Sequence, residues 1–192
     1  MTELESVVRE ASVCRHCAEW MPHEPRPVFQ VSETCKLLIV GQAPGRRVQQ
    51  SGKPWDDPSG DRLREWLGLS EAEFYDPALV GHLPIGFCYP GHGPHGDLPP
   101  RKECAPLWHP RLLPLLKSVR LLVLVGGYAQ AYYLGRGAGV SERVRKWKES
   151  LPRYLPLPHP SPRNNIWLGR HPWFAHEVLP EVRATVRDLV ES

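Results

Sequence analysis

The segment Cys35-Lys-Leu-Leu-Ile-Val-Gly-Gln-Ala-Pro-Gly45 joins a short apolar run to a turn of small and rigid residues. An uninterrupted apolar run of this length is typical of a strand that is buried on both faces of a sheet. Residues 120–125, closed by Gly126 and Gly127, have the same character. Strands of this kind occur in parallel sheets that are covered by helices, so we expect an α/β fold.

Strand and helix patterns alternate along the rest of the chain. Residues 79–87 and 154–157 are further strand candidates, which bring the expected strands to four. Segments with helical spacing lie between them, and Ser141 is a suitable N-cap for one helix. We therefore expect a mostly parallel sheet with helices on both faces. The expected helices span residues 2–12, 60–69, 102–118, 128–133, 141–150 and 173–190, and a Pro/Gly loop spans 89–101.

Two turns of unusual composition follow predicted strands. Gly41-Gln-Ala-Pro-Gly45 follows the first strand, and His159-Pro-Ser161 follows the last one. In parallel α/β sheets, the loops at the carboxyl ends of the strands build the binding site. We therefore expect both turns to contribute to one active site.

The size and composition are those of one soluble domain. The chain has 192 residues, of which 41% are hydrophobic and 23% are charged, so we expect a single domain over residues 1–192. Its apolar runs are far too short to span a bilayer. Residues 1–10 are acidic and polar, unlike a secretory signal, so we expect a cytoplasmic protein. Five cysteines, an odd number, argue against a disulfide framework.

The charge is unevenly distributed. The net charge of +3 is too small to identify a partner, but residues 136–173 hold eight Lys or Arg against two Glu. Such a basic stripe can neutralise the phosphates of a nucleic acid. A solvated surface with spare cations explains the stripe equally well.

Four of the cysteines are spaced like the ligands of one metal centre. Cys14 and Cys17 form a C-x2-C pair, which places two thiolates on one tight turn. Cys88 and Cys104 bracket a loop that can fold back to complete the four ligands of an iron–sulfur cubane. We therefore expect a [4Fe–4S] cluster, with structural zinc as the alternative. A buried free thiol explains Cys35, inside an apolar strand, but explains the C-x2-C pair poorly.

Three features together resemble the uracil-DNA glycosylase superfamily, particularly its iron–sulfur branches, families 4 and 5. The first motif reads Gly41-Gln-Ala-Pro-Gly45 and precedes Gly52-Lys-Pro-Trp55, and the second reads His159-Pro-Ser-Pro-Arg-Asn164. The four cysteines have the order and nearly the spacing of the cluster ligands in those families. The second motif is also similar to single-strand-selective monofunctional uracil glycosylases, which lack the cluster. The resemblance implies a three-layer fold with a central four-stranded, mostly parallel sheet, and a monomeric DNA glycosylase of base excision repair.

The resemblance also implies roles for individual residues. Loss of a base leaves negative charge on that base, which calls for a preorganised hydrogen-bond donor, and His159 matches the family's donor. Gln42 would position water. Apart from the resemblance, Asp57 or its neighbour Asp56, next to Trp55, can orient water or stabilise the positive sugar. Because the base must leave the stack first, Trp55 would stack on it. Further base or DNA contacts are implied for Gly41, Ala43, Pro44, Gly45, Ser161, Arg163 and Asn164, with Ile166 or Trp167 as a wedge.

Three positions depart from the family pattern. Family 4 enzymes carry a glutamate at the position of Gln42, and family 1 enzymes carry an aspartate at the position of Ala43. Neither residue of this chain can deprotonate water. The asparagine that reads uracil in the family falls on Pro84, whose side chain cannot distinguish uracil from cytosine. Uracil remains the first expected substrate, and hypoxanthine, xanthine or a modified pyrimidine are the alternatives.

Other functions also fit the sequence. The protein can capture uracil-containing or abasic DNA without turnover, or it can be a zinc-stabilised binding module with a degenerate pocket. No basic loop with a histidine follows the first motif, which disfavours covalent capture. The expected partner is DNA, either single-stranded or duplex with a flipped base. We expect no association with a membrane. We assign no role to His82, His92, His95 or His109, because histidines in a Pro/Gly loop are more often surface residues.

Overall fold

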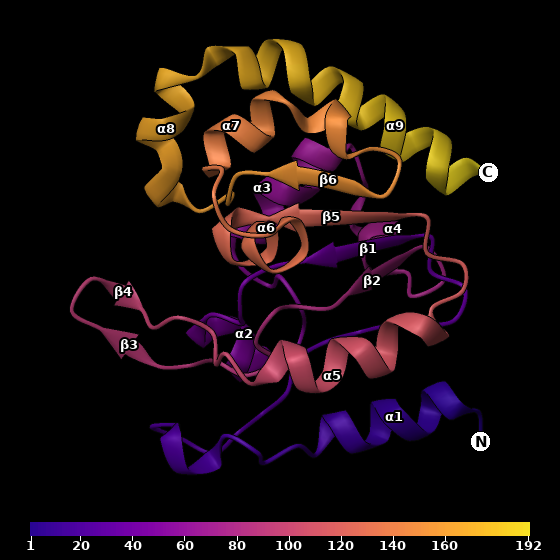
Figure 1. Ribbon diagram of the computed structural model, residues 1–192, viewed down its shortest axis with the longest axis vertical. Helices are drawn as coiled ribbons and strands as arrows, with labels where there is room; N and C mark the ends of the chain where they lie inside the picture. Colours follow the sequence, from indigo (N-terminus) through magenta and orange to yellow (C-terminus); the bar gives the residue numbers. More distant parts are fainter.

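The computed structural model describes residues 1–192 and has an α/β architecture (Figure 1). Four strands form one sheet in the order β2-β1-β5-β6, and every neighbouring pair is parallel. The expectation of a four-stranded, mostly parallel sheet is confirmed. The strands are β1 (Leu37–Val40), β2 (Val80–His82), β5 (Leu121–Val125) and β6 (Tyr154–Leu157).

Helices connect these strands and continue to the C-terminus. Shorter helical turns span Ala18–Trp20, Leu113–Leu115, Trp147–Ser150 and Pro162–Asn164, and a π-helical turn spans Phe174–Val178. None of the helices is both long and apolar enough to cross a membrane. The α-helices are α1 (Glu3–Ser12), α2 (Arg46–Ser51), α3 (Pro58–Leu67), α4 (Glu71–Tyr75), α5 (Cys104–Leu112), α6 (Gly126–Leu134), α7 (Val140–Arg145), α8 (Asn165–Arg170) and α9 (Leu179–Glu191).

Alternation along the central strands divides the core into two layers. In β1, Leu37 and Ile39 join a cluster with residues of α3 and α9, whereas Leu38 and Val40 join a second cluster with residues of α1 and α5. Successive side chains of a strand point to opposite faces, so these helices cover opposite faces of the sheet. All four β1 residues are completely buried, which explains why their sequence is continuously apolar.

Two expectations about strands and loops need correction. The strand expected over residues 79–87 ends at His82. The chain nevertheless stays beside β1, since Ile85 N–H donates to the Gly41 carbonyl at 2.9 Å. Leu83 N–H likewise donates to the Ile39 carbonyl at 2.9 Å, and Pro84 between them is tolerated because the N–H of that position would point away from β1, as that of His82 does. The expected Pro/Gly loop contains a hairpin of β3 (His92–Gly93) and β4 (Gly96–Asp97), which projects from the body of the molecule (Figure 1).

The expected helices differ mainly at their ends. Ser141 is not an N-cap, because α7 begins at Val140 and Gly139 precedes it. The Ser141 hydroxyl instead accepts a hydrogen bond from the Trp167 indole at 2.7 Å. The helix expected over 102–118 is shorter, as α5 ends at Leu112 and a 3-10 turn follows. Three short helices, α2, α4 and α8, were not expected from the sequence.

Candidate active site

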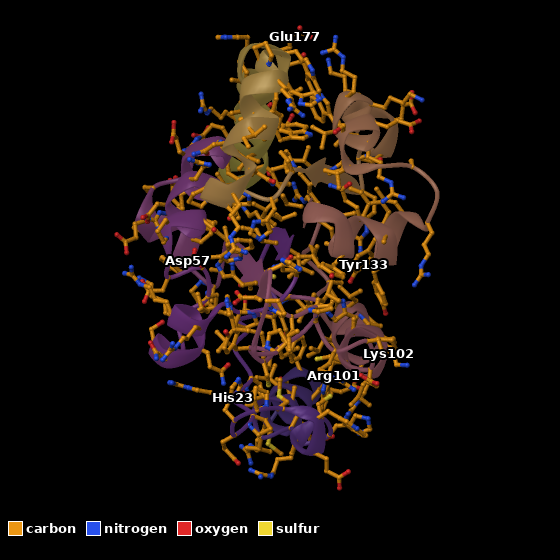
Figure 2. The ribbon with its side chains drawn as sticks, turned by 90° about the vertical axis from the view of Figure 1, so that its left-hand side faces the viewer. His23, Asp57, Arg101, Lys102, Tyr133 and Glu177 are labelled. Carbon is orange, nitrogen blue, oxygen red and sulfur yellow. The ribbon has the colours of Figure 1, made fainter.

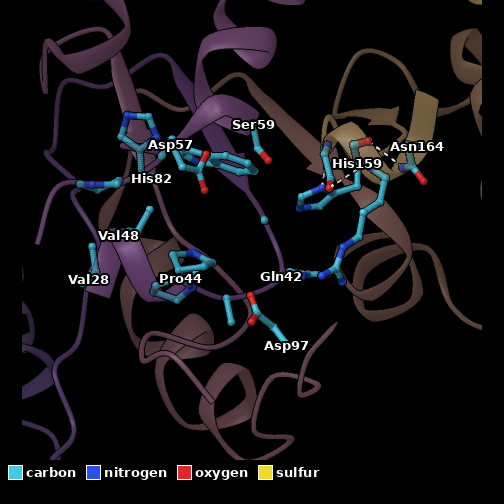
Figure 3. Close-up of a pocket in the computed structure, with 18 residues that line it drawn as sticks. Val28, Gln42, Pro44, Val48, Asp57, Ser59, His82, Asp97, His159 and Asn164 are labelled. Carbon is cyan, nitrogen blue, oxygen red and sulfur yellow. Dashed lines mark hydrogen bonds between the residues drawn. The ribbon is translucent and has the colours of Figure 1, made fainter. Parts of the chain in front are cut away.

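A cavity of about 440 Å³ opens at the carboxyl ends of the strands (Figure 3). We call it the base cavity. The turns after β1 and β6 meet here, as expected from their position in a parallel sheet. Most of the residues predicted from the sequence line it, namely Gly41, Gln42, Ala43, Pro44, Gly45, Trp55, Asp57, His159, Ser161, Arg163 and Asn164, whereas Asp56 and the wedge candidates Ile166 and Trp167 do not. Residues to which the sequence analysis gave no role also line it, namely Val28, Val48, Pro54, Ser59, His82, Pro84 and Asp97.

The imidazole of His159 is fixed in one orientation. The Ser161 N–H donates to Nδ1 at 3.1 Å, and the Asn164 amide donates to the His159 carbonyl at 2.7 Å. Since Nδ1 accepts, the proton of the neutral ring lies on Nε2. Burial lowers the pKa of His159 to about 4, so the ring is neutral at pH 7. The base cavity therefore holds a neutral donor, Nε2–H, on a ring that cannot easily turn.

Trp55 lies beside this histidine in an unusual backbone conformation. The two ring centroids are 6.0 Å apart. Trp55 has a φ of 58°, a left-handed value that is unfavourable for a bulky residue. Its indole lies so close to Gly41 that a Cβ at that glycine would be 2.7 Å from Cζ2. The surrounding structure therefore holds a strained tryptophan in the wall of the cavity, a common feature of functional sites.

Replacing Gly60 with alanine is expected to destabilise the protein. A Cβ at Gly60 would lie 1.8 Å from the carbonyl oxygen of Trp55, so the backbone of one of them must move. Overpacking of this kind costs about 1–3 kcal/mol, measurable by urea unfolding. Gly169→Ala is the matched control, because nothing lies within 4 Å of an added Cβ there. Equal stability of the two variants would show that the Trp55 backbone is not held in place.

Gln42 and Asp57 both line the cavity, but the Gln42 side chain has no partner whereas the Asp57 side chain is held by a hydrogen bond. The Gln42 backbone carbonyl accepts from Gly86 N–H at 2.8 Å, and its side-chain amide has no partner in the protein. Asp57 is the N-cap of α3, and its Oδ1 accepts from Gly60 N–H at 2.9 Å. Burial raises the pKa of Asp57, while that hydrogen bond acts in the opposite direction. Asp57 thus has a structural role, and its Oδ2 lies on the side of Gly45.

The turn after His159 is braced from two sides. Arg62 donates to the Pro160 carbonyl at 3.3 Å and to the Asn165 side chain at 2.8 Å. Arg163 donates to the His95 carbonyl at 3.3 Å and so connects this turn to the β3–β4 hairpin. Ile166 follows the turn and is 69% exposed. An exposed apolar side chain therefore lies two residues after Asn164, which lines the base cavity.

The β3–β4 hairpin contributes an acid that the sequence analysis missed. Asp97 lines the base cavity and accepts from the Tyr89 hydroxyl at 3.3 Å. Gly93 and Gly96 flank Pro94 and His95 in the sequence, which predicts a turn. The pattern predicts neither the hairpin nor the direction in which it folds, which decides that Asp97 reaches the cavity.

A family model described as the uracil DNA glycosylase superfamily matches residues 29–183. The chain belongs to the uracil-DNA glycosylase superfamily. The matched residues include both motifs of the base cavity, the hairpin and all four strands of the sheet. They also include Cys88 and Cys104 but not Cys14 and Cys17. The match therefore accounts for the fold and the base cavity of this uracil-DNA glycosylase superfamily member, and it leaves the cysteine site to be judged from the structure.

The four cysteines of the predicted cluster line a second, smaller and mostly apolar cavity, the cysteine cavity. Phe87 N–H donates to the Cys104 sulfur at 3.3 Å, as backbone amides do for cluster-bound thiolates. No disulfide is formed, and no group of three or more His, Cys, Asp or Glu side chains is spaced to hold a metal ion. The lining residues are Cys14, Cys17, Met21, Pro25, Pro27, Gly86, Phe87, Cys88, Arg101, Cys104 and Trp108.

The cysteine cavity is electrostatically suited to thiolates only if a positive group is present. Burial raises the pKa of both Cys88 and Cys104 to about 12. Burial also raises the pKa of Cys17, whereas a hydrogen bond from Arg101 acts to lower it. Figure 2 shows Arg101 toward the end of the molecule that carries the N-terminal segment, with Asp57 of the base cavity nearer the middle. Cys35 is completely buried two residues before β1 and does not line this cavity.

The expected basic stripe is partly neutralised. Arg145 pairs with Glu177, and Lys146 pairs with Glu142. The exposed Arg46 and Arg47 at the start of α2 lie next to the first motif instead. Cations available for phosphate groups are therefore found at the base cavity as well as along the stripe.

The stability of the protein is expected to fall as the pH falls from about 6.5 to about 4. Burial lowers the pKa of His82, His109 and His159 to about 4. In this window the unfolded chain binds protons that the folded chain does not. Each histidine therefore lowers the free energy of unfolding by up to about 1.4 kcal/mol for each pH unit. Urea unfolding at pH 7 and pH 5 measures the effect, and His109→Gln should reduce the slope. Equal stability at both values would contradict the expectation.

Proposed function

We propose that this protein is a monofunctional DNA glycosylase that hydrolyses the N-glycosidic bond of a deaminated or damaged base, first of all uracil, in base excision repair. The observation that carries the proposal is that His159, with its Nε2–H donor, and the strained Trp55 lie side by side in one cavity. Superfamily membership supports a DNA glycosylase as the general activity. The protein would act as a cytoplasmic monomer with one catalytic domain over residues 1–192.

In this proposal His159 acts as the electrophilic donor. As the bond to the sugar breaks, negative charge develops on an oxygen of the base, and Nε2–H donates to it. The neutral ring suits this task because it stabilises the anion without transferring its proton. The Ser161 N–H holds the opposite nitrogen, so little reorganisation is needed in the transition state. Trp55 stacks on the extruded base and holds it in position.

We assign the positioning of water to Gln42 and the stabilisation of the positively charged sugar to Asp57. The free Gln42 amide can orient water but cannot deprotonate it. Asp57, when ionised, stabilises the positive sugar through its charge, although its role as a helix cap fixes one of its oxygens. In a dissociative cleavage the glycosidic bond breaks with little assistance from the attacking water. A weakly held water is therefore sufficient. The proposal therefore predicts a slow enzyme rather than an inactive one.

DNA contacts are assigned to the rims of the base cavity. Backbone groups of Gly41, Ala43, Pro44 and Gly45 approach the base and sugar closely. Ser161, Arg163 and Asn164 contact the phosphate backbone or the unpaired base. Ile166 is the better wedge of the two apolar candidates, because it is exposed whereas Trp167 packs against the core. The substrate is DNA with a flipped base, in single-stranded or duplex form.

We also propose that Cys14, Cys17, Cys88 and Cys104 hold a [4Fe–4S] cluster, with structural zinc as the alternative. Support comes from their shared cavity and from the backbone donor to Cys104. The cluster would order the loops and carry no electrons in the reaction. Residues 84–88 run from the wall of the base cavity to the cysteine cavity. An ordered cysteine site therefore positions Pro84 in the wall that faces the base.

A second candidate is excision of another base. Pro84 lies in the cavity wall where the family's uracil-reading asparagine is expected, and it offers no side-chain hydrogen bond. Hypoxanthine, xanthine or a modified pyrimidine would then be the substrate. Capture of uracil-containing or abasic DNA without turnover is the remaining alternative.

Product analysis tests the proposed function. The cluster-loaded protein is incubated with duplex DNA that carries one uracil, and the supernatant is examined for the free base by mass spectrometry. We expect free uracil and a strand that stays intact until alkali cleaves the abasic site. Strand cleavage without alkali would contradict the monofunctional assignment. A covalent protein–DNA band on a denaturing gel, without a free base, would replace hydrolysis by capture.

A further inference from the structure

His82, at the end of β2, presents a buried acceptor that no protein group satisfies. The residue is 1% exposed and yet lines the base cavity. Its Nε2 lies 2.9 Å from the Phe74 carbonyl, which can only accept, so Nε2 carries the proton. Nδ1 then holds a bare lone pair, and neither a protein donor nor solvent reaches it. An unsatisfied buried acceptor in a native fold calls for a functional explanation.

The ring of His82 is held rigidly in this state. It packs against Phe74 and Tyr75, with ring centroids 4.8 Å and 6.0 Å away. Its backbone exchanges two hydrogen bonds with Gln30, at 2.6 Å and 2.9 Å. Burial lowers the pKa of His82 to about 4, so Nδ1 remains an acceptor at neutral pH. Tautomer and orientation are therefore both set before a ligand binds.

His82 lies across the base cavity from His159, where it can face an extruded base. Figure 3 shows His82 and His159 on opposite sides of the cavity. A pyrimidine that places its O2 near His159 turns the next positions of its ring, N3–H and then O4, along the cavity toward the wall that holds His82. The nearby Val28 and Val48 are apolar, and the Pro84 carbonyl is already bonded to the His109 ring at 2.9 Å. Nδ1 of His82 is therefore an acceptor at that end that no protein group already uses.

We propose that Nδ1 of His82 accepts a hydrogen bond from a ring N–H of the base and so replaces the reading that Pro84 cannot provide. Deamination turns the bare N3 of cytosine, or the bare N1 of adenine, into an N–H donor. An acceptor placed there pairs with the deaminated base and repels the lone pair of its parent. The substrate class is thus deaminated bases with a new ring N–H. This inference rests on the proposed glycosylase function, and it requires a small shift of the side chains that cover Nδ1.

Two variants of His82 test the inference on matched oligonucleotides carrying uracil or hypoxanthine. His82→Phe keeps an aromatic ring and removes the Nδ1 acceptor together with the Nε2–H donated to the Phe74 carbonyl, so cleavage should fall at least about tenfold while DNA affinity stays unchanged. His82→Asn places an oxygen near the position of Nδ1 and should recover part of the rate. Cleavage by His82→Phe at the wild-type rate would overturn the inference. Equal losses in both variants, with reduced unfolding stability, would also overturn it and make His82 a structural residue.

A binding readout separates this inference from the proposed function. Free uracil and free cytosine are titrated into protein labelled with ¹⁵N at histidine, and His82→Phe assigns the His82 signals. We expect the Nδ1 signal to shift with uracil and not with cytosine. This readout holds even if the wild-type protein cleaves no substrate, in which case only the proposed function fails. An unmoved Nδ1 signal at saturating uracil would overturn the role of His82, whatever the cleavage assay gives.

Discussion

His159→Ala is expected to lower base release about 10²- to 10³-fold, the usual effect of removing one donor to a developing anion. DNA affinity should remain nearly unchanged, because the side chain meets only the leaving base. Single-turnover cleavage of a uracil-containing oligonucleotide measures the first quantity, and fluorescence anisotropy with the same oligonucleotide measures the second. The change removes a ring whose burial has already lowered its pKa to about 4, so no charge is lost at pH 7.

His176→Ala is the matched control for this variant. His176 is exposed in the π-helical turn before α9 and does not line the base cavity. We expect it to leave both cleavage and binding at wild-type values. A parallel loss of cleavage and DNA affinity in His159→Ala would show that the histidine is structural. Unchanged cleavage would remove it from the mechanism.

Cys104→Ser is expected to remove the cluster and most of the activity. Cys104 is one of the most deeply placed of the four cysteines, and a backbone N–H already points at its sulfur. The wild-type protein should be brown and contain about four iron atoms per chain, and the variant should be nearly colourless. DNA affinity should also fall, because the residues that join the two cavities lose their anchor. Visible absorption, iron analysis and binding by anisotropy measure these effects.

Cys35→Ala provides the control for the cysteine variant. Cys35 is completely buried but lies in the sheet core, away from the cysteine cavity. It should keep the full visible spectrum and iron content. A colourless wild-type protein that contains zinc would contradict the iron–sulfur assignment and leave a structural zinc site. Loss of colour in Cys35→Ala as well would show that general destabilisation, and not ligand loss, releases the cluster.

Much of the fold could be predicted from the sequence because two strands carry a pattern with few alternatives. The residues of β1 and β5 are apolar without interruption, which requires burial on both faces. Helix ends were less predictable. Ser141 has the chemistry of an N-cap, but a tertiary hydrogen bond from Trp167 decides its role. Local sequence does not contain that partner, which lies in α8.

The candidate site could also be predicted only in part from the sequence. The turns at Gly41 and His159 could be placed together from topology alone, because both follow parallel strands. Asp57 was predicted as an electrostatic aid, and the structure adds its role as the cap of α3. Asp97 and His82 were not predicted to lie in the cavity. Their positions depend on the fold of the hairpin and on the packing of β2 against α4, which no short motif encodes.

A panel of damaged oligonucleotides measures directly whether this protein removes deaminated bases from DNA. Cluster-loaded protein is given single-stranded and duplex oligonucleotides that carry uracil, hypoxanthine or xanthine, alongside undamaged controls, and abasic sites are cleaved with alkali. We expect cleavage of at least one deaminated base, uracil first, no cleavage of cytosine or adenine, and no covalent adduct on a denaturing protein gel. Absence of cleavage on every substrate by fully loaded protein would contradict a DNA glycosylase acting on deaminated bases.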